Sequence, residues 1–215
     1  MKKILLLGDS IRMGYDEFVR ARLDGRAEVF YPEDNGRFAQ YTLRTLENWK
    51  DELKLDRVDL VHWNNGLWDI LHLNTGEAAG DGEAEGVMSR PAAADAGKTV
   101  SYDKDPLTPP DMYAYMIERI RRRIGQLFPG AKVVFAFTTP VIEEQASWAY
   151  RSNAEIRQYN EIARNVLAPR GVAFNDLHRF AGEHCSHLHS DWVHYSPEGC
   201  DILAAEIVEF LEKDL

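Results

Sequence analysis

The stretch Lys3-Ile4-Leu5-Leu6-Leu7-Gly8-Asp9-Ser10 decides the fold that this sequence predicts. The run from Lys3 to Leu7 is typical of a buried strand. Gly8 follows it and can take the backbone angles of a sharp turn from a strand into a helix. We therefore expect Ser10 at the carboxyl end of a central strand, where open α/β sheets place their ligands.

Predicted helices and strands alternate along the rest of the chain. Apolar residues at helical spacing, such as Leu46, Trp49 and Leu53, mark the helices. The last helix opens at Ser196-Pro197, a candidate N-cap followed by a proline at the first helical position. The predicted helices cover 15–23, 41–54, 113–128 and 156–167, and the further predicted strands cover 27–31, 58–63, 132–137 and 171–174. This alternation favours parallel βαβ units in a doubly wound sheet.

One long segment, from about Asn74 to Pro110, interrupts this alternation. It is rich in Gly, Ala, Asp and Glu, and it is longer than a connection inside a compact domain normally needs. We expect a functional loop such as a lid, or a mobile acidic loop without a role. Because it follows the strand that leads to Asn64, it is expected to border the mouth of the site that contains Ser10.

Length and charge restrict the remaining possibilities. The 215 residues suit a single domain, 1–215, that contains the insertion at about 74–110. A formal charge of −10 argues against a nucleic-acid partner, because phosphate binding needs clustered Lys and Arg. No stretch approaches the roughly 20 apolar residues that span a bilayer, so no membrane partner is expected. The sequence does not predict the oligomeric state.

The amino terminus and the cysteines favour a cytoplasmic protein. The apolar run after Met1-Lys2-Lys3 stops at Gly8-Asp9, which is too short for a secretion signal. Cys185 and Cys200 are too few for a disulfide framework. Reduced thiols are expected, and one bridge between them stays open.

Three side chains from the two ends of the chain can act together. A hydroxyl is a poor nucleophile at neutral pH and needs an imidazole to take its proton, with an acid to fix the imidazole tautomer. In Asp191-Trp192-Val193-His194, the acid stands three residues before the imidazole on a turn that enters a helix. This spacing can bring the carboxylate to one ring nitrogen while the other faces outward. Ser10, His194 and Asp191 therefore predict the nucleophile, base and acid of a serine esterase.

The same residues carry a resemblance to a known family. Gly8-Asp9-Ser10-Ile11 near one end, with Asp191 and His194 near the other, resembles the GDSL, or SGNH, hydrolases from Lys3 to about Ile207. The resemblance implies a three-layer α/β/α sandwich with a five-stranded parallel sheet in the flavodoxin-like order 2-1-3-4-5. It also implies hydrolysis of small-molecule esters through an acyl-serine intermediate, with no cofactor and no metal.

The resemblance further implies three hydrogen-bond donors for the oxyanion. These are the amides of Ser10 and Gly36, where Gly36 matches the glycine of the second block, and the side chain of Asn64. The third block of the family usually reads Gly-x-Asn-Asp or Gly-x-Asn-Asn, whereas this chain reads His62-Trp63-Asn64-Asn65-Gly66. Alignment on the asparagines makes Asn64 the donor, with Asn65 as second choice.

Two further features of this alignment matter. It puts His62 where the family has glycine, and a shifted alignment would set Gly66-Leu67-Trp68-Asp69 against the block instead.

Trp68 and Trp192 are close enough in sequence to the proposed site to contact substrate, as aromatic surfaces stack on sugars or acyl chains. The segment His184-Cys185-Ser186-His187-Leu188-His189 lacks a second ligand cluster, so no zinc site is predicted.

By analogy with the family, short-chain esters are the favoured substrates, with an acetylated sugar first among them. The alternatives are a lysophospholipase or thioesterase, and a noncatalytic carbohydrate-binding protein on the same fold. A flavodoxin-like regulatory domain would need a phosphate-binding loop or an acidic phosphoacceptor cluster, of which only Asp9 is present.

Overall fold

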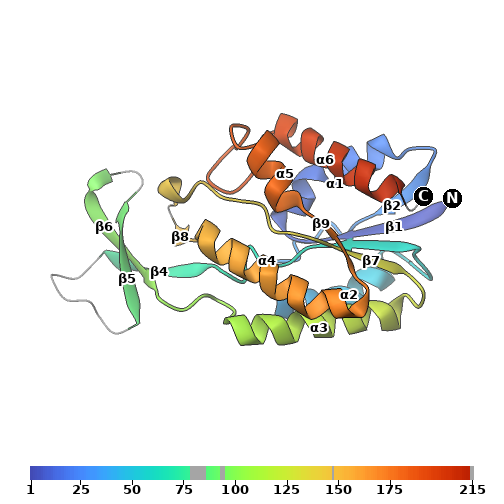
Figure 1. Cartoon of the computed structure of the whole chain (residues 1–215), viewed down its shortest axis with the longest axis horizontal. Helices are drawn as coiled ribbons and strands as arrows, with labels where there is room; N and C mark the ends of the chain where they lie inside the picture. The colour runs from blue at the N-terminus through green and yellow to red at the C-terminus, as the bar shows by residue number, and fades with distance from the viewer. Residues whose placement is uncertain (78–85, 93–94, 147, 214–215) are drawn as a thin grey trace.

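The computed structural model describes residues 1–77, 86–92, 95–146 and 148–213. Its main sheet has five parallel strands in the order β2-β1-β3-β7-β9 (Figure 1). These strands are β1 (Lys2–Leu7), β2 (Ala27–Phe30), β3 (Leu60–Trp63), β7 (Lys132–Ala136) and β9 (Ala173–Asn175). Counted within this sheet the order is 2-1-3-4-5, so the predicted topology is confirmed.

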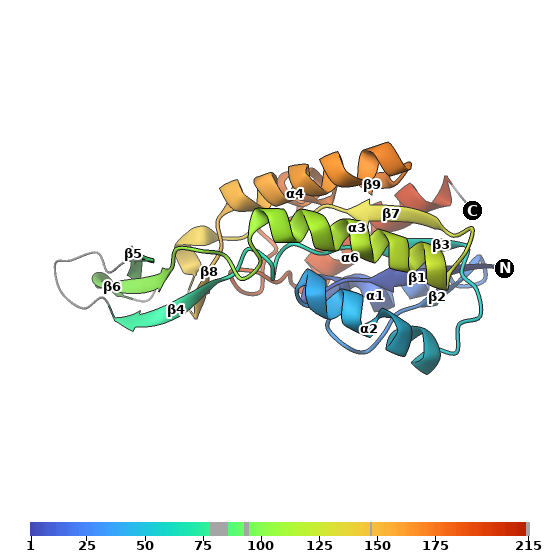
Figure 2. The same cartoon turned by 90° about the horizontal axis from the view of Figure 1, so that it is seen from below.

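Helices cover both faces of this sheet (Figures 1 and 2). One layer holds α1 (Ser10–Arg22), α5 (Leu177–His184) and α6 (Pro197–Glu212). The other holds α2 (Ala39–Glu52), α3 (Pro110–Leu127) and α4 (Asn153–Leu167). Each helix turns an apolar stripe inward; on α3 the stripe of Tyr113, Ile117, Ile120 and Ile124 is fully buried. The predicted three-layer α/β/α sandwich is therefore confirmed, with α5 as a helix that the sequence pattern did not reveal.

As expected, the central strand β1 leads directly into the turn Gly8-Asp9-Ser10, here called the serine turn. Leu5 to Leu7 of β1 are buried between the two helical layers. The Asp9 side chain then accepts a hydrogen bond from the Ile11 N–H at 3.0 Å and caps α1. This cap starts the helix at Ser10, five residues before the predicted start at Tyr15. At the other end of the chain, Ser196 caps α6 and Pro197 is its first residue, as predicted.

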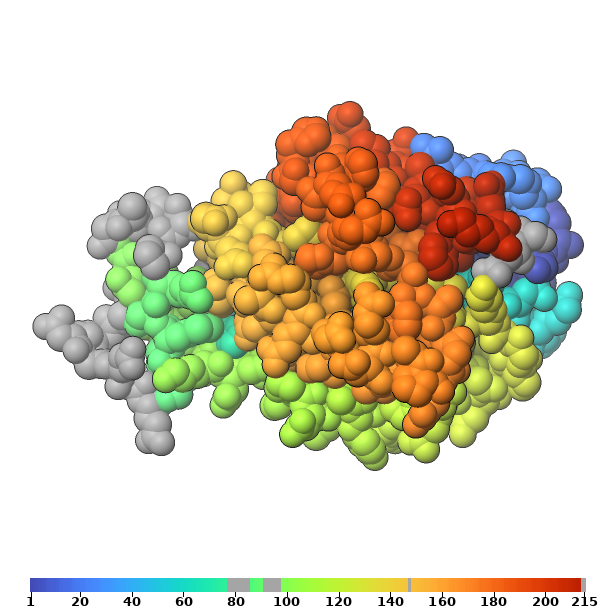
Figure 3. Space-filling model, in the orientation of Figure 1, coloured from blue at the N-terminus to red at the C-terminus, as the bar shows by residue number. Residues whose placement is uncertain are grey.

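The interrupting segment builds a second sheet. Strands β4 (His72–Glu77), β5 (Val87–Ala92) and β6 (Asp95–Asp103), here called the β-arm, join the short β8 (Ala149–Tyr150) in the antiparallel order β5-β6-β4-β8. The β-arm stands out from the rounded α/β/α body, on the side away from the chain termini (Figures 1 and 3). The expectation of a loop is wrong for the described part of this segment, while residues 78–85 and 93–94 lie outside the described residues.

Aromatic and polar contacts anchor the root of the β-arm. Tyr102 is buried, and its ring lies 5.8 Å from that of Tyr150. The His72 ring lies between the Asp103 carbonyl and the Glu155 carboxylate, at 2.8 Å from each. Glu155 belongs to the first turn of α4, so the root is held against the body.

Two further findings concern the helices and the cysteines of the described residues. None of these helices combines the length and apolar character needed to cross a bilayer. Cys185 and Cys200 are both buried and free, which agrees with the expected reduced thiols.

Candidate active site

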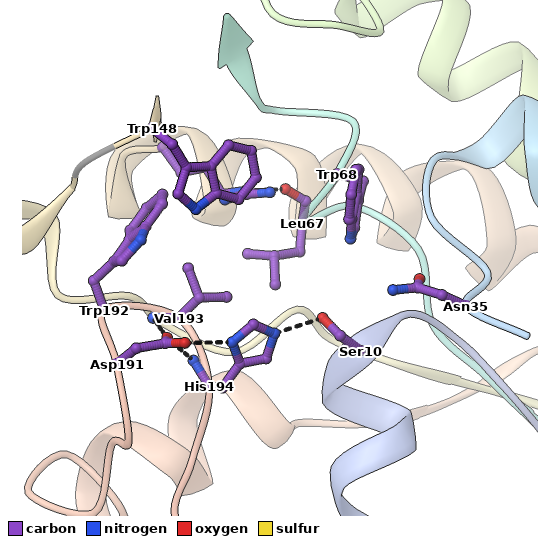
Figure 4. Close-up of a pocket in the computed structure, with 10 residues that line it drawn as sticks. Ser10, Asn35, Leu67, Trp68, Trp148, Asp191, Trp192, Val193 and His194 are labelled. Carbon is purple, nitrogen blue, oxygen red and sulfur yellow. Dashed lines mark hydrogen bonds and ion pairs between the residues drawn. The ribbon is translucent and has the colours of Figure 1, made fainter. Parts of the chain in front are cut away.

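The structure brings Ser10, His194 and Asp191 into one hydrogen-bonded row (Figure 4). The His194 Nε2 atom lies 2.8 Å from the Ser10 Oγ, and its Nδ1 lies 2.7 Å from Asp191 Oδ2. Ser10 starts α1, while Asp191 and His194 lie on the loop before α6, 184 residues beyond Ser10 in the case of His194. The two sequence motifs therefore meet at the carboxyl end of β1.

The Asp191 carboxylate shapes the loop that carries His194. Its Oδ1 accepts hydrogen bonds from the Val193 and His194 N–H groups, both at 2.7 Å, while Oδ2 contacts the ring. Burial acts to raise the pKa of Asp191, but these hydrogen bonds and the nearby imidazole outweigh it and hold the pKa below its usual range. Asp191 therefore stays charged and orients the ring, although the pair is about half exposed and adds little to folding stability.

A pocket of about 230 Å³ opens beside the Ser10 hydroxyl. Leu67, Trp68, Trp148, Trp192 and Val193 form its apolar wall (Figure 4). The polar lining consists of Ser10, Asn35, Arg151, Asp191 and His194. Trp68 and Trp192 both line the pocket, as expected from the sequence. No described residue of 74–110 lines it, although that segment was expected to border its mouth.

Gly36 lies directly against the serine turn. Its N–H donates a hydrogen bond to the Gly8 carbonyl at 2.9 Å. A Cβ atom at position 36 would lie 2.5 Å from the Gly8 carbonyl oxygen, closer than real Cβ contacts come. The close approach of these two backbones explains why a residue without a side chain occupies this position.

Comparison with known proteins decides the family. The profile of the GDSL-like lipase/acylhydrolase family matches residues 6–202. The chain belongs to this family. Membership makes the protein an ester hydrolase, which agrees with the enzyme class predicted from the two terminal motifs. A comparison with curated proteins finds no match.

Solved structures share the GDSL hydrolase fold with this chain. The lipase/acylhydrolase from Enterococcus faecalis is 18% identical with a TM-score of 0.69, covering 100% of this chain and 97% of that one. A member of the lipolytic G-D-S-L family from Veillonella parvula is 16% identical with a TM-score of 0.61, covering 99% and 100%. The acetyl xylan esterase AlAXEase is 15% identical with a TM-score of 0.64, covering 97% and 99%.

The asparagines of the third GDSL block have different surroundings. The Asn64 Nδ2 donates to the Ala136 carbonyl at 2.8 Å and lies 3.4 Å from the Thr138 Oγ1. The Asn65 Nδ2 donates to the Arg37 carbonyl and to Thr42 Oγ1, each at 3.0 Å. Asn65 thus ties the third block to the second. Asn64 lies beside the serine turn, and the second N–H of its amide makes only the long contact to Thr138.

Asp69, which the shifted alignment would place in the third block, makes a structural hydrogen bond. Asp69 is fully buried, and its Oδ1 accepts a hydrogen bond from the Ala39 N–H at the start of α2, whose N-cap residue Phe38 offers no side-chain cap. Burial raises the pKa of Asp69 to about 7. Leu67 and Trp68 form part of the pocket wall.

Sequence reasoning missed two residues that shape the second GDSL block. The Arg12 guanidinium, buried on α1, donates to the carbonyls of Pro32 and Asp34 and pairs with Asp16 at 2.6 Å. It therefore fixes the chain just before Asn35. The Asn35 Oδ1 accepts the Arg37 N–H at 2.8 Å, and its nitrogen end points into the pocket toward Ser10 (Figure 4).

Proposed function

We propose that this GDSL hydrolase cleaves short-chain esters through an acyl intermediate on Ser10. The observation that carries the proposal is the continuous contact from Asp191 through His194 to the Ser10 hydroxyl, which opens onto the pocket. In this arrangement one ring nitrogen is oriented by a carboxylate, and the other is within reach of the hydroxyl proton.

The contacts support a two-step acyl transfer. His194 Nε2 takes the Ser10 proton as Oγ attacks the ester carbonyl, and Asp191 holds the Nδ1–H and stabilises the charged ring. The tetrahedral intermediate collapses, the C–O bond to the alcohol breaks, and His194 returns the proton to the leaving oxygen. Water then attacks the acyl-serine by the same route and releases the acid.

Donors around Ser10 supply the oxyanion site in this proposal. The Ser10 N–H is the first of α1, and the first N–H groups of a helix have no acceptor within it. The family resemblance adds the Gly36 N–H, which now donates to Gly8, and the Asn64 side chain. We add Asn35, because its Oδ1 is held by Arg37 and its Nδ2 faces Ser10.

The pocket favours a small acyl group. Its volume of about 230 Å³ is below the roughly 300–1,000 Å³ typical of pockets for larger ligands. An acetyl group fits this space, and the tryptophan surfaces suit a sugar ring as the alcohol part. The acetyl xylan esterase among the structural neighbours is consistent with this choice. A lysophospholipase or thioesterase with a long acyl chain is the second candidate.

A fluorophosphonate probe tests the proposal most directly. The wild-type protein should be labelled once, on Ser10, and should hydrolyse p-nitrophenyl acetate. Ser10→Ala should lose both, and Asp191→Asn should lower kcat strongly, with circular dichroism and melting temperature nearly unchanged. Ser186→Ala, at an exposed serine on the neighbouring loop, is the matched control. An unlabelled wild-type protein that still binds sugars would favour the noncatalytic alternative.

A further inference from the structure

Arg151 is a buried cation in the wall of the active-site pocket. It follows β8, and only 2% of its surface is exposed, yet it lines the pocket together with Ser10. Its Nε donates a hydrogen bond to the Leu67 carbonyl. Among the described residues, no acceptor meets its enclosed Nη1 atom. Leaving such a donor unpaired costs free energy, so the position calls for an explanation.

Three tryptophans surround this guanidinium. Its central carbon lies 5.9 Å from the ring centre of Trp68, 5.5 Å from that of Trp148 and 5.2 Å from that of Trp192. Such aromatic faces stabilise a positive charge. Burial lowers the pKa of Arg151 to about 10, so the group is still charged at neutral pH. The site therefore keeps a desolvated positive charge at the pocket wall.

The acidic groups nearest to Arg151 do not pair with it directly. Asp9 and Asp191 attract its charge, but no carboxylate of the described residues forms an ion pair with the guanidinium. The Oδ1 atom of Asp9 caps α1, while its Oδ2 has no hydrogen-bond partner among the described residues, and Asp191 is engaged by His194 and Val193. A neutral donor would satisfy the Leu67 carbonyl equally well, so this contact alone does not explain an arginine.

We propose that the pocket selects esters that also carry a carboxylate, which binds the Arg151 guanidinium while the ester carbonyl lies at Ser10. The proposal rests on the esterase function above and adds a substrate class to it. A carboxylate forms strong charge-assisted hydrogen bonds with a guanidinium, and here it would meet Nη2, because the Leu67 carbonyl occupies Nε and Nη1 is enclosed. Both residues line one pocket of about 230 Å³, so the carboxylate and the ester belong to one small substrate.

Paired substrates test the proposal on the intact protein. Mono-4-nitrophenyl succinate and its neutral methyl ester place the charge on the acyl side, and 4-acetoxybenzoate and its methyl ester place it on the alcohol side. The readout is the ratio of kcat/KM for the charged ester to that for the neutral one. We expect a ratio above about ten for one pair in the wild type.

Variants assign the preference to Arg151. Arg151→Gln should bring the ratio to about one, and Arg151→Lys should give an intermediate ratio because lysine keeps the charge but not the geometry of the guanidinium. Arg157→Gln removes an exposed positive charge from α4 and should keep the wild-type ratio. A preference that survives in Arg151→Gln would overturn the proposal.

The wild-type protein keeps the proposal testable even if the Arg151 variants do not fold. A ratio near one for both pairs, with Ser10 still labelled and p-nitrophenyl acetate still cleaved, overturns the carboxylate preference and leaves the esterase function standing. Loss of labelling and of all ester cleavage would instead overturn the proposed function itself.

Discussion

Asn35, Asn64 and Asn65 all lie near the serine turn, but their hydrogen bonds give them different consequences. The Asn65 amide is fully used between Arg37 and Thr42, and its Oδ1 accepts from the Trp63 indole at 2.7 Å. Asn64 and Asn35 each keep an N–H without a short hydrogen bond to the described residues. Asn65 is therefore part of the scaffold, whereas Asn35 and Asn64 are the side chains that we propose as donors to a substrate oxygen.

Alanine substitutions should separate these roles. Asn64→Ala and Asn35→Ala should each lower kcat by roughly a hundredfold with little change in KM, because an oxyanion contact forms mainly in the transition state. Asn65→Ala should instead lower the free energy of unfolding by about 1–3 kcal/mol, since it leaves buried groups unpaired. Steady-state kinetics and urea unfolding of each variant give the answer. If Asn65→Ala loses kcat and Asn64→Ala loses stability instead, the alignment of the third block must move by one residue.

At the element scale, the β-arm contacts the body through its root and through two residues of β5. At the root, Tyr102 packs on Tyr150 and His72 contacts Glu155. From β5, the Arg90 guanidinium lies 4.2 Å from the Tyr150 ring centre, and Met88 packs against the core. The rest of the outer part is held by the arm's own ladder, so its strands depend mainly on one another. Strand β8, which pairs with β4, leads directly to Arg151 and so links the root to the pocket wall.

Two truncations should distinguish the outer β-arm from its root. Replacing residues 76–99 by a short Gly-Ser linker should keep the cooperative unfolding and the hydrolysis of p-nitrophenyl acetate. Replacing residues 75–105 also removes Tyr102 and Asp103, and should cost about 3 kcal/mol more, as expected for loss of a buried aromatic ring. Thermal and urea unfolding measure the difference. Equal stability of the two variants would show that the root contacts contribute nothing.

The parallel sheet was predictable from sequence, whereas the β-arm was not. Apart from the short α5, each buried strand and amphipathic helix of the body carries its own local pattern, as the stripe of α3 shows. Strands β4 to β6 are polar and become strands only through their partners, which local sequence does not reveal. Likewise Asp191 and His194 are close in sequence and were found, but Arg12 and Arg151 acquire their roles only through distant carbonyls and rings.

At the scale of the whole molecule, a buried histidine makes stability depend on pH. His62 on β3 is fully buried, and neither ring nitrogen has a hydrogen-bond partner among the described residues. Burial lowers its pKa to about 4, against about 6.5 in the unfolded chain. Between these values the unfolded state binds more protons, so this residue makes stability fall as the pH drops from about 6.5 to about 4.

His62→Met should remove this dependence. The free energy of unfolding of the variant, relative to the wild type, should rise by roughly 3 kcal/mol as the pH falls across that window. Urea unfolding at a series of pH values measures it, and the difference between the two proteins cancels the effect of other titrating groups. His187→Gln, at an exposed histidine, should follow the wild type. Parallel curves for His62→Met and the wild type would contradict the assignment.

The contact between Ser10 and His194 spans 184 residues and is backed by the packing of α1 against α6. A ribosome makes His194 184 residues after Ser10, and folding of such distant contacts waits for the later segment. The proposed nucleophile is therefore present without its proposed base until that segment has emerged. Ester turnover should begin only after the loop before α6 has emerged and packed beside α1, so the activity reports that the two segments have come together.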